Sequence, residues 1–204
     1  MPAKLLGAVL IMLLTSIPCA AGSKELTLTS ESALWLAGDS TLHPFTSRTS
    51  QLKLNAVLDA QEASAAPAKD VVQEILQQDG LKTFNLSIPV EALKSGHSGL
   101  DKNMYKALNS RECPSIDFQM LHYEVGTSTA ASLPVRASGT LRVACRQKTV
   151  TLEAALTPEP GALRVQGTYP LLMTDYGVTP PRLMLGAIKV KDEVVVHYDL
   201  RMTP

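Results

Sequence analysis

The side chains of this sequence that could perform catalysis are four histidines and the aspartates nearest to them. A hydrolase would need one histidine and one carboxylate to converge in a cleft, with shifted pKa values. None of these residues lies in a nucleophile elbow, an HExxH motif or a glycine-rich phosphate loop. We therefore predict that the protein is not an enzyme. The residues considered are His43, His97, His122, His197, Asp39, Asp101, Asp117 and Asp199.

Three aromatic or imidazole side chains could contact a ligand without catalysing a reaction. His43 precedes Pro44 between two predicted strands, so it could lie at the mouth of a pocket. Trp35 and Tyr169 could stack on a ligand, but buried aromatic side chains usually belong to the core, because each removes a large apolar area from water. We expect Trp35 and Tyr169 to lie in the core.

The N-terminal end of the chain has the order of a secretory signal peptide. Lys4 supplies the positive charge, Leu5 to Leu14 form a short apolar run, and Ala20-Ala21-Gly22 supplies the small residues of a cleavage site. The apolar run is too short to cross a bilayer, which needs about 20 residues. We predict a cleaved signal peptide over residues 1–22, one domain over residues 23–204, a periplasmic or secreted location, and no stable membrane insertion.

The cysteines that remain after cleavage indicate a disulfide. They are Cys113 and Cys145, and an even number in an exported protein favours pairing because the compartment is oxidising. They flank a predicted hairpin, where a bulge or a one-residue offset in register would bring them opposite each other. Cys19 raises a lipoprotein alternative, although Pro18 beside it is a poor context for acylation. The Cys and His spacings of a zinc site are missing, so we expect no metal and no cofactor.

Charge excludes further classes of partner. Lysine and arginine together number 19, as do aspartate and glutamate, so the chain carries no net charge. No net field then attracts nucleic acid or an anionic membrane surface, and we expect no nucleic-acid partner. A homodimer is left open.

Alternation of apolar and polar residues predicts strands with one buried and one solvated face. Asp59 to Gly80 interrupts this pattern, and we interpret it as a partly mobile insertion in which Val71, Val72, Ile75 and Leu76 could form one short helix. The eight predicted strands are Ala33–Thr41, Phe45–Leu58, Leu81–Val90, Ile116–Met120, Val135–Val143, Val150–Leu156, Leu163–Met173 and Ile188–Met202.

A short amphipathic helix is predicted between the third and fourth strands. Leu100, Met104 and Leu108 are spaced four residues apart and share one face, and Pro114 prevents continuation of the helix. Ser98 is expected to cap the helix, with Asp101 three positions later in a capping-box arrangement.

Eight antiparallel strands in hairpin succession predict an all-β fold, an eight-stranded antiparallel barrel with one short helix after the third strand. A closed barrel removes exposed strand edges, and its interior is either filled by side chains or wide enough for one small ligand. A two-sheet sandwich is the competing architecture.

Several segments of the chain follow one another in a recognisable order. They are SIPVEALKSGHSGLDKNMYKALNSRECPSIDF, ASGTLRVACRQKTVTLEA, YPLLMTDYGV and GAIKVKDEVVVHYDL. Together they resemble the YceI-like family of secreted bacterial proteins, over Ala33 to Arg201. The resemblance implies a lipocalin-like barrel, an apolar interior that accommodates a long isoprenoid chain, and a periplasmic or secreted location. The residues that match family motifs are Asp101, Pro114, Ile116, Phe118, Gly139, Leu141, Asp175, Tyr176 and Gly177.

We therefore expect an exported protein that holds one long apolar ligand, an isoprenoid or another lipid-like molecule, inside the barrel. The helix Ser98–Leu108 and the loop Asp175–Ala187 are the expected lids. The alternatives are a filled barrel that acts as a structural or interaction module and, less readily, a hydrolase. The predicted lining is Phe84, Leu86, Ile88, Ile116, Phe118, Met120, Leu141, Val143, Val165, Leu171, Val196 and Tyr198, with His43, Met104 and Tyr176 at the mouth or in a lid.

Overall fold

The computed structural model describes residues 22–60, 75, 80–127 and 132–204. The expected signal peptide lies outside these residues except for Gly22, and so do Val71, Val72 and Leu76 of the helix expected in the insertion. Within the described ranges, no helix is long and apolar enough to cross a membrane.

Strands make up most of the described chain, and the helix α2 lies between β5 and β6. The elements are β1 (Gly22–Leu28), β2 (Ala33–Ser40), β3 (Phe45–Thr49), β4 (Lys53–Ala60), β5 (Leu81–Pro89), η1 (Val90–Ala92), α2 (Ser98–Ala107), β6 (Ser115–Val125), β7 (Leu133–Val143), β8 (Arg146–Glu159), β9 (Ala162–Leu172), η2 (Met173–Tyr176), β10 (Arg182–Leu183), η3 (Met184–Gly186) and β11 (Ile188–Thr203).

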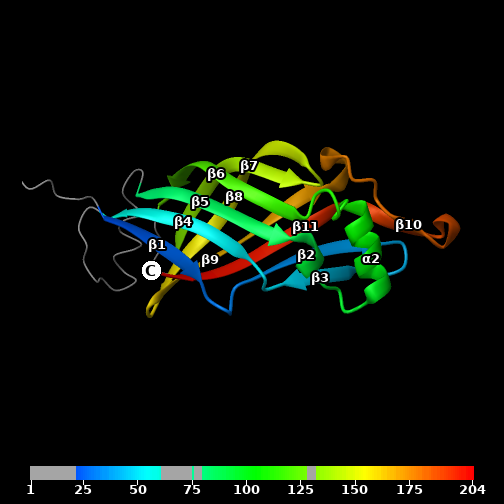
Figure 1. Cartoon of the computed structure of the whole chain (residues 1–204), viewed down its shortest axis with the longest axis horizontal. Helices are drawn as coiled ribbons and strands as arrows, with labels where there is room; N and C mark the ends of the chain where they lie inside the picture. The colour runs from blue at the N-terminus through cyan, green and yellow to red at the C-terminus, as the bar shows by residue number, and fades with distance from the viewer. Residues whose placement is uncertain (1–21, 61–74, 76–79, 128–131) are drawn as a thin grey trace, which may run out of the picture.

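Eight of the strands form a closed ring. Neighbours pair antiparallel in the order β1, β4, β5, β6, β7, β8, β9 and β11, and β11 returns to β1 through the pairs Thr27↔Thr203 and Leu28↔Met202. Figure 1 shows the resulting elongated barrel, with β1 and the C-terminus towards one end and α2 at the other. This closure confirms the predicted barrel and excludes the two-sheet sandwich.

The first hairpin explains why the sheet contains more strands than the ring. β2 pairs with β3 as well as with β11, and β3 forms a further bridge from Arg48 to Lys94 just before α2. The prediction of one strand over Phe45–Leu58 is wrong, because β3 ends at Thr49 and β4 begins at Lys53. The chain turns between them, where the Gln51 amide donates to the hydroxyl of Thr49 at 2.9 Å.

Glycines in the barrel wall leave room for aromatic rings that lie across it. At each of these positions a Cβ atom would collide with the ring of an aromatic residue on the neighbouring strand. A side chain there would push the ring away from the wall. Glycine at these positions therefore allows the aromatic ring to lie close against the strand. The pairs are Gly38 with Phe45, Gly139 with Phe118, and Gly167 with Tyr198.

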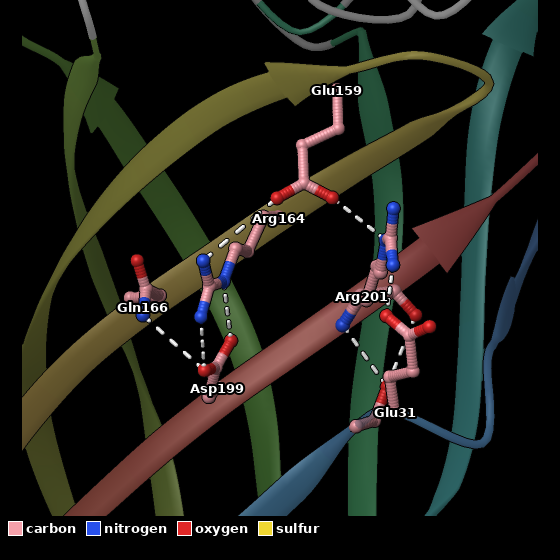
Figure 2. Close-up of polar contacts among 7 residues, drawn as sticks. Glu31, Glu159, Arg164, Gln166, Asp199 and Arg201 are labelled. Atoms are coloured by element: carbon pink, nitrogen blue, oxygen red, sulfur yellow. Dashed lines mark hydrogen bonds and ion pairs between the residues drawn. The ribbon is translucent and has the colours of Figure 1, made fainter.

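An ion-pair network ties β8, β9, β11 and the corner between β1 and β2 together (Figure 2). Arg164 donates to both carboxylate oxygens of Asp199, at 2.8 and 2.7 Å. Glu159 lies 2.7 Å from Nε of Arg201 and 3.8 Å from Nη1 of Arg164, and Arg201 also pairs with Glu31. Bidentate geometry and shared partners make such a network stronger than isolated surface pairs.

The helix α2 begins without the predicted capping box. Its N-cap is His97 rather than Ser98, and no side chain caps the helix amides. Asp101 instead accepts hydrogen bonds from the amide of Ser95 at 2.8 Å and from its hydroxyl at 2.6 Å. The hydroxyl of Ser95 lowers the pKa of Asp101, so this carboxylate holds the turn before the helix in place of a cap.

The structure contains the predicted disulfide between Cys113 and Cys145, whose Cα atoms lie 5.4 Å apart. A register that placed the two cysteines directly opposite each other would pair Phe118 with Thr140. β6 and β7 instead pair Phe118 with Leu141, an offset of one residue, and the register shifts by one more residue between Met120 and His122. The expected offset is therefore confirmed. Cys145 occupies the tight turn between β7 and β8 with a positive φ of 61°.

Candidate functional site

A cavity of about 230 Å³ runs inside the barrel. Its lining includes Leu26 and Met202 near the end where β1 meets β11, and Phe45 and Val190 near the end covered by α2. Apolar cavities of about 150 Å³ stay dry and bind small hydrocarbons. The barrel is thus not filled by its own side chains, and the space inside it suits an apolar molecule.

The side chains that line this cavity are apolar apart from the hydroxyls of three tyrosines and one amide. The Tyr198 hydroxyl donates to the carbonyl of Glu153 at 2.6 Å, and the Tyr123 hydroxyl donates to the carbonyl of Ile75 at 3.0 Å. Burial raises the pKa of Tyr198 to about 12, so this side chain stays neutral. The two polar groups of the lining that make no side-chain hydrogen bond to described residues are Asn103 and Tyr169.

The strand alternation placed the interior residues well. All twelve side chains of the predicted lining border the cavity, and so does Met104 of α2. They come from β5, β6, β7, β9 and β11, whose alternate residues point inward because side chains along a strand alternate between its faces. The structure therefore brings the whole predicted set together around one space, and contact with a ligand stays a prediction.

His43 and Tyr176 do not border the cavity. His43 is exposed beyond the end of β2, and its Nδ1 atom lies 2.9 Å from the carbonyl oxygen of Pro44. Tyr176 is buried in η2, in a cluster with Val90 and Val178, and burial raises its pKa to about 12. Its hydroxyl finds no hydrogen-bond partner among the described residues.

The helix α2 provides part of the cavity wall that the strand pattern did not identify. Leu100, Asn103, Met104 and Ala107 of α2 and its C-cap Leu108 all border the cavity. These residues follow the helical spacing of three and four, so the apolar stripe of the helix faces the barrel interior. The helix lies at the end of the barrel away from β1 (Figure 1), and its role as a lid stays a prediction.

Other lining residues lie in segments to which no strand was assigned from the sequence. Leu26 belongs to β1, which directly follows the signal-like segment, and Ile75 lies in the insertion that we interpreted as irregular. From the loop expected to form a second lid, the described lining includes Val178 and Pro181. Apolar alternation in β1 is the signal that could have identified Leu26.

Trp35 was expected in the core but lies on the outer face of the barrel. Its ring stacks on His197 of β11 with centroids 5.0 Å apart and nearly parallel planes, and the guanidinium of Arg48 lies 4.9 Å from its centroid. Leu34 and Leu36, the neighbours of Trp35 along β2, are the residues that face the cavity.

The histidines and aspartates do not form a catalytic arrangement in the described part of the chain. Asp199 pairs with Arg164, Asp117 pairs with Arg142 at 2.6 Å, and Asp101 binds the Ser95 turn. The histidine nearest to a carboxylate is His122, 4.0 Å from Glu124 with both side chains largely exposed. No group of three potential metal ligands occurs among the described residues.

The fold is shared with solved structures from several bacteria. BcnA of Burkholderia cenocepacia superposes with a TM-score of 0.63 and 12% identity, covering 86% of this chain and 99% of that one. A polyisoprenoid binding domain from Saccharophagus degradans, implicated in plant cell wall breakdown, gives 0.60 and 14%, covering 90% and 98%. The YceI protein of Campylobacter jejuni gives 0.52 and 12%, covering 76% and 81%.

Identities this low show a common fold and leave the ligand of this chain to be argued separately. None of the curated proteins matches the sequence. The sequence pattern of the YceI-like domain, however, matches residues 31–202, which include all the strands from β2 to β9 and nearly all of β11. The chain therefore belongs to the family of proteins with a YceI-like domain.

Proposed function

We propose that the protein holds one long, mostly hydrocarbon ligand of the polyisoprenoid class inside the barrel, and that it does so outside the cytoplasm. The observation that carries this proposal is the continuous apolar cavity, lined from the β1 end to α2. Burying each methylene group contributes about 0.8 kcal/mol. A partly enclosed chain of this kind can therefore offset the several kcal/mol lost on association.

Two features favour this reading over the alternatives. A filled barrel acting as an interaction module would leave no cavity of about 230 Å³ between Leu26 and Val190. A hydrolase would place a histidine and a carboxylate at the cavity wall, whereas the polar groups there are tyrosine hydroxyls and the amide of Asn103. The relative from Saccharophagus degradans, described as a polyisoprenoid binding domain, agrees with the choice of ligand class.

The polar lining residues suggest an orientation for the ligand. Asn103 lies on α2, so a polar head group at that end of the barrel could meet its amide, while the hydrocarbon tail would extend towards Leu26 and Met202. The Asn103 side chain is half-buried and makes no side-chain hydrogen bond to the described residues, so a polar head group could hydrogen-bond to its amide in place of water. Asn103→Leu should therefore change the preference between head groups more than the dependence on tail length.

Export is part of the same proposal and rests on the signal-like order of the N-terminal residues. Cleavage after Ala21 or Gly22 would leave Ser23 of β1, which pairs with Asp59 of β4, in the mature chain. Mass spectrometry of exported protein should show a mature chain that begins close to Ser23. A mass that includes residues 1–14, or a diacylglyceryl group on Cys19, would contradict this cleavage.

The ligand itself is tested on protein purified without detergent. An organic extract should contain a prenyl lipid, and delipidated protein should bind prenyl chains in solution. Ile88→Trp and Leu141→Trp each place a large ring in the cavity and should abolish binding while the circular dichroism spectrum stays unchanged.

The matched control is His43→Ala, since His43 is exposed and does not border the cavity. This variant should bind as the wild type does. If the extract holds no lipid and delipidated protein binds no prenyl chain of any length, the proposed function is wrong. Loss of binding in His43→Ala but not in the two tryptophan variants would place the site outside the barrel.

A further inference from the structure

Two hairpin ends join into one projecting apolar tip at the end of the barrel away from β1. The first lies between β2 and β3 and carries Leu42, and the second lies between β10 and β11 and carries Met184 and Leu185. Leu42 is 64% exposed, Met184 is 75% exposed and Leu185 is fully exposed. We call these three side chains the apolar tip. Figure 1 shows β10 reaching past α2 at this end of the molecule.

Hydrogen bonds hold the two hairpin ends together. The amide of Thr41 donates to the carbonyl of Lys189 at 3.0 Å, and the amide of Lys189 donates to the hydroxyl of Thr41 at 3.1 Å. Within the first hairpin, Ser40 Oγ accepts from the amides of Leu42 and His43, each at 3.2 Å. The apolar side chains are therefore displayed on a fixed scaffold.

The backbone of the second hairpin adds a separate observation. Met184 and Leu185 have positive φ values of 49° and 54°, in the left-handed region that glycine and asparagine occupy at lower cost. A solvated turn would ordinarily carry such residues. Here the chain places two large apolar side chains in strained positions and exposes both to water, which indicates a functional role for this hairpin.

Two cations behind the apolar tip indicate the kind of surface that it binds. Arg182 and Lys189 face each other across the β10–β11 pair directly behind Met184 and Leu185, and both are exposed. Neither forms an ion pair with the described residues, whereas nearby Lys191 is bound to Asp39 at 2.7 Å. The chain has no net charge, so this is a local pair of unneutralised cations behind an apolar point.

Residues next to the apolar tip in the sequence border the cavity. Pro181 and Val190, joined by a hydrogen bond of 3.1 Å, border the cavity and lie next to Arg182 and Lys189 in the sequence. Phe45, two residues after His43, borders it too. The tip therefore projects from the rim of the cavity.

We propose that the apolar tip docks the protein onto a bilayer that contains anionic lipids, with the three apolar side chains entering the interface and Arg182 and Lys189 meeting the lipid phosphates. Apolar side chains backed by cations are the arrangement that binds such interfaces. A stable protein partner needs about 1,200 Å² or more of complementary surface, which suits a projecting point poorly. Docking would set the rim of the cavity against the membrane, so that a lipid ligand could pass between them.

The test is sedimentation of the full-length mature protein with vesicles of phosphatidylcholine and phosphatidylglycerol, and with vesicles of phosphatidylcholine alone. Wild-type protein should bind the anionic vesicles more tightly, and added salt should weaken the binding. Met184→Asn with Leu185→Asn should lower the partition coefficient at least tenfold, since asparagine accepts the left-handed backbone but is polar. Arg182→Gln with Lys189→Gln should lower it about tenfold on anionic vesicles only.

The matched control is Leu121→Asn, because Leu121 is 66% exposed on β6 and is not part of the tip. This variant should bind as the wild type does. Absence of vesicle binding, or an equal loss in Leu121→Asn, would overturn the proposal. Self-association that the two tip asparagines abolish, without vesicle binding, would assign the tip to a second copy of the chain.

Docking and ligand binding can fail separately. Ile88→Trp blocks the cavity without touching the tip, so it should bind vesicles normally while losing the prenyl ligand. The tip variant should retain its ligand in solution. Docking without any ligand would leave this inference standing and remove the proposed function.

Discussion

At the residue scale, Gly167 shows how one absent side chain shapes the cavity wall. It pairs with Tyr198 across β9 and β11, and a Cβ atom there would collide with the tyrosine ring and with the carbonyl of Glu153. The same geometry allows the Tyr198 hydroxyl to bond that carbonyl at 2.6 Å. The glycine thus permits both a ring that borders the cavity and a satisfied buried hydroxyl.

Gly167→Ala should therefore destabilise the fold by about 1–3 kcal/mol, the usual cost of overpacking. Urea unfolding at neutral pH measures this loss. Gly99→Ala on α2 is the control, since a Cβ atom there meets nothing within 4 Å and alanine favours a helix. Equal stabilities of Gly167→Ala and the wild type would mean that the ring moves freely.

Asp199 gives the ion-pair network a predictable dependence on pH. Hydrogen bonds from Arg164 hold the pKa of Asp199 below its ordinary value of 3.8. The folded state therefore favours the ionised carboxylate, and this contribution to stability is present above about pH 4 and is lost as the pH falls through the lowered pKa.

Asp199→Asn should reduce the free energy of unfolding by about 1–2 kcal/mol at pH 7. The difference from the wild type should shrink as the pH falls below 4 and disappear below the lowered pKa, because the wild-type carboxyl of the folded protein is then protonated too. Urea unfolding of the wild type and of Asp199→Asn, at pH 7 and at a pH below the lowered pKa, measures the difference in free energy of unfolding. Asp39→Asn, which loses an exposed pair with Lys191, should change stability less. A pH-independent difference would contradict the lowered pKa.

At the element scale, strand alternation predicted most of the barrel because each strand has one wet face. Where successive residues of a strand are all apolar, the pattern does not indicate which face of the strand is buried. Leu34, Trp35 and Leu36 are such a run, and Trp35 was placed inside although the leucines are the residues that face the cavity. The stack of Trp35 with Arg48 and His197 depends on pairing across three strands, which a single segment does not reveal.

Local hydrogen bonds explain the other errors. The break between β3 and β4 and the start of α2 both depend on a serine or threonine side chain that competes for backbone groups. Thr49 and Ser95 also fit a continuous strand or a loop, so their types alone do not mark these turns. The apolar stripe of α2 could be predicted, since Leu100, Met104 and Leu108 are spaced regularly over about two turns, whereas the surface that the stripe covers required the tertiary structure.

The disulfide links the segment just before β6 to the turn just after β7, next to the last pair of these neighbouring strands, Asp117 with Arg142. Cys113 precedes β6 and Cys145 lies in the turn between β7 and β8, at a sequence separation of 32. Closing a loop of this length stabilises a fold by about 3–4 kcal/mol in the chain-entropy treatment.

Replacing both Cys113 and Cys145 by serine should therefore lower the free energy of unfolding by about that amount. Denaturant unfolding measures it, and reduction of the wild type with a thiol should give a similar loss. Two free thiols in non-reduced, denatured protein would show that the bond does not form in the mature chain.

At the scale of the whole molecule, the barrel acts as a slot with a closed end and a covered end. Leu26, Val135, Leu163 and Met202 pack together where β1 meets β11, and they also border the cavity. The helix α2 covers the opposite end (Figure 1). If the ligand enters beside α2 with its tail first, tail length decides how far it reaches.

Affinity should then rise with each added isoprene unit and stop rising once the slot is full. Each methylene that is buried contributes about 0.8 kcal/mol, about a fourfold change in Kd. Titration calorimetry with prenyl chains of increasing length measures the series. A Kd that is independent of length would show that the tail stays outside the barrel.

Val135→Phe tests the direction of entry, because Val135 is small and lies at the closed end. The larger ring should shorten the longest tail that still improves affinity and leave short chains unaffected. Leu171→Phe, in the cluster that includes Tyr176 and Val178 and faces α2, is the matched substitution nearer the mouth. It should weaken short and long chains alike, since every tail must pass that point. If the two variants show the opposite pattern, the ligand enters from the β1 end, and α2 closes the barrel without serving as its lid.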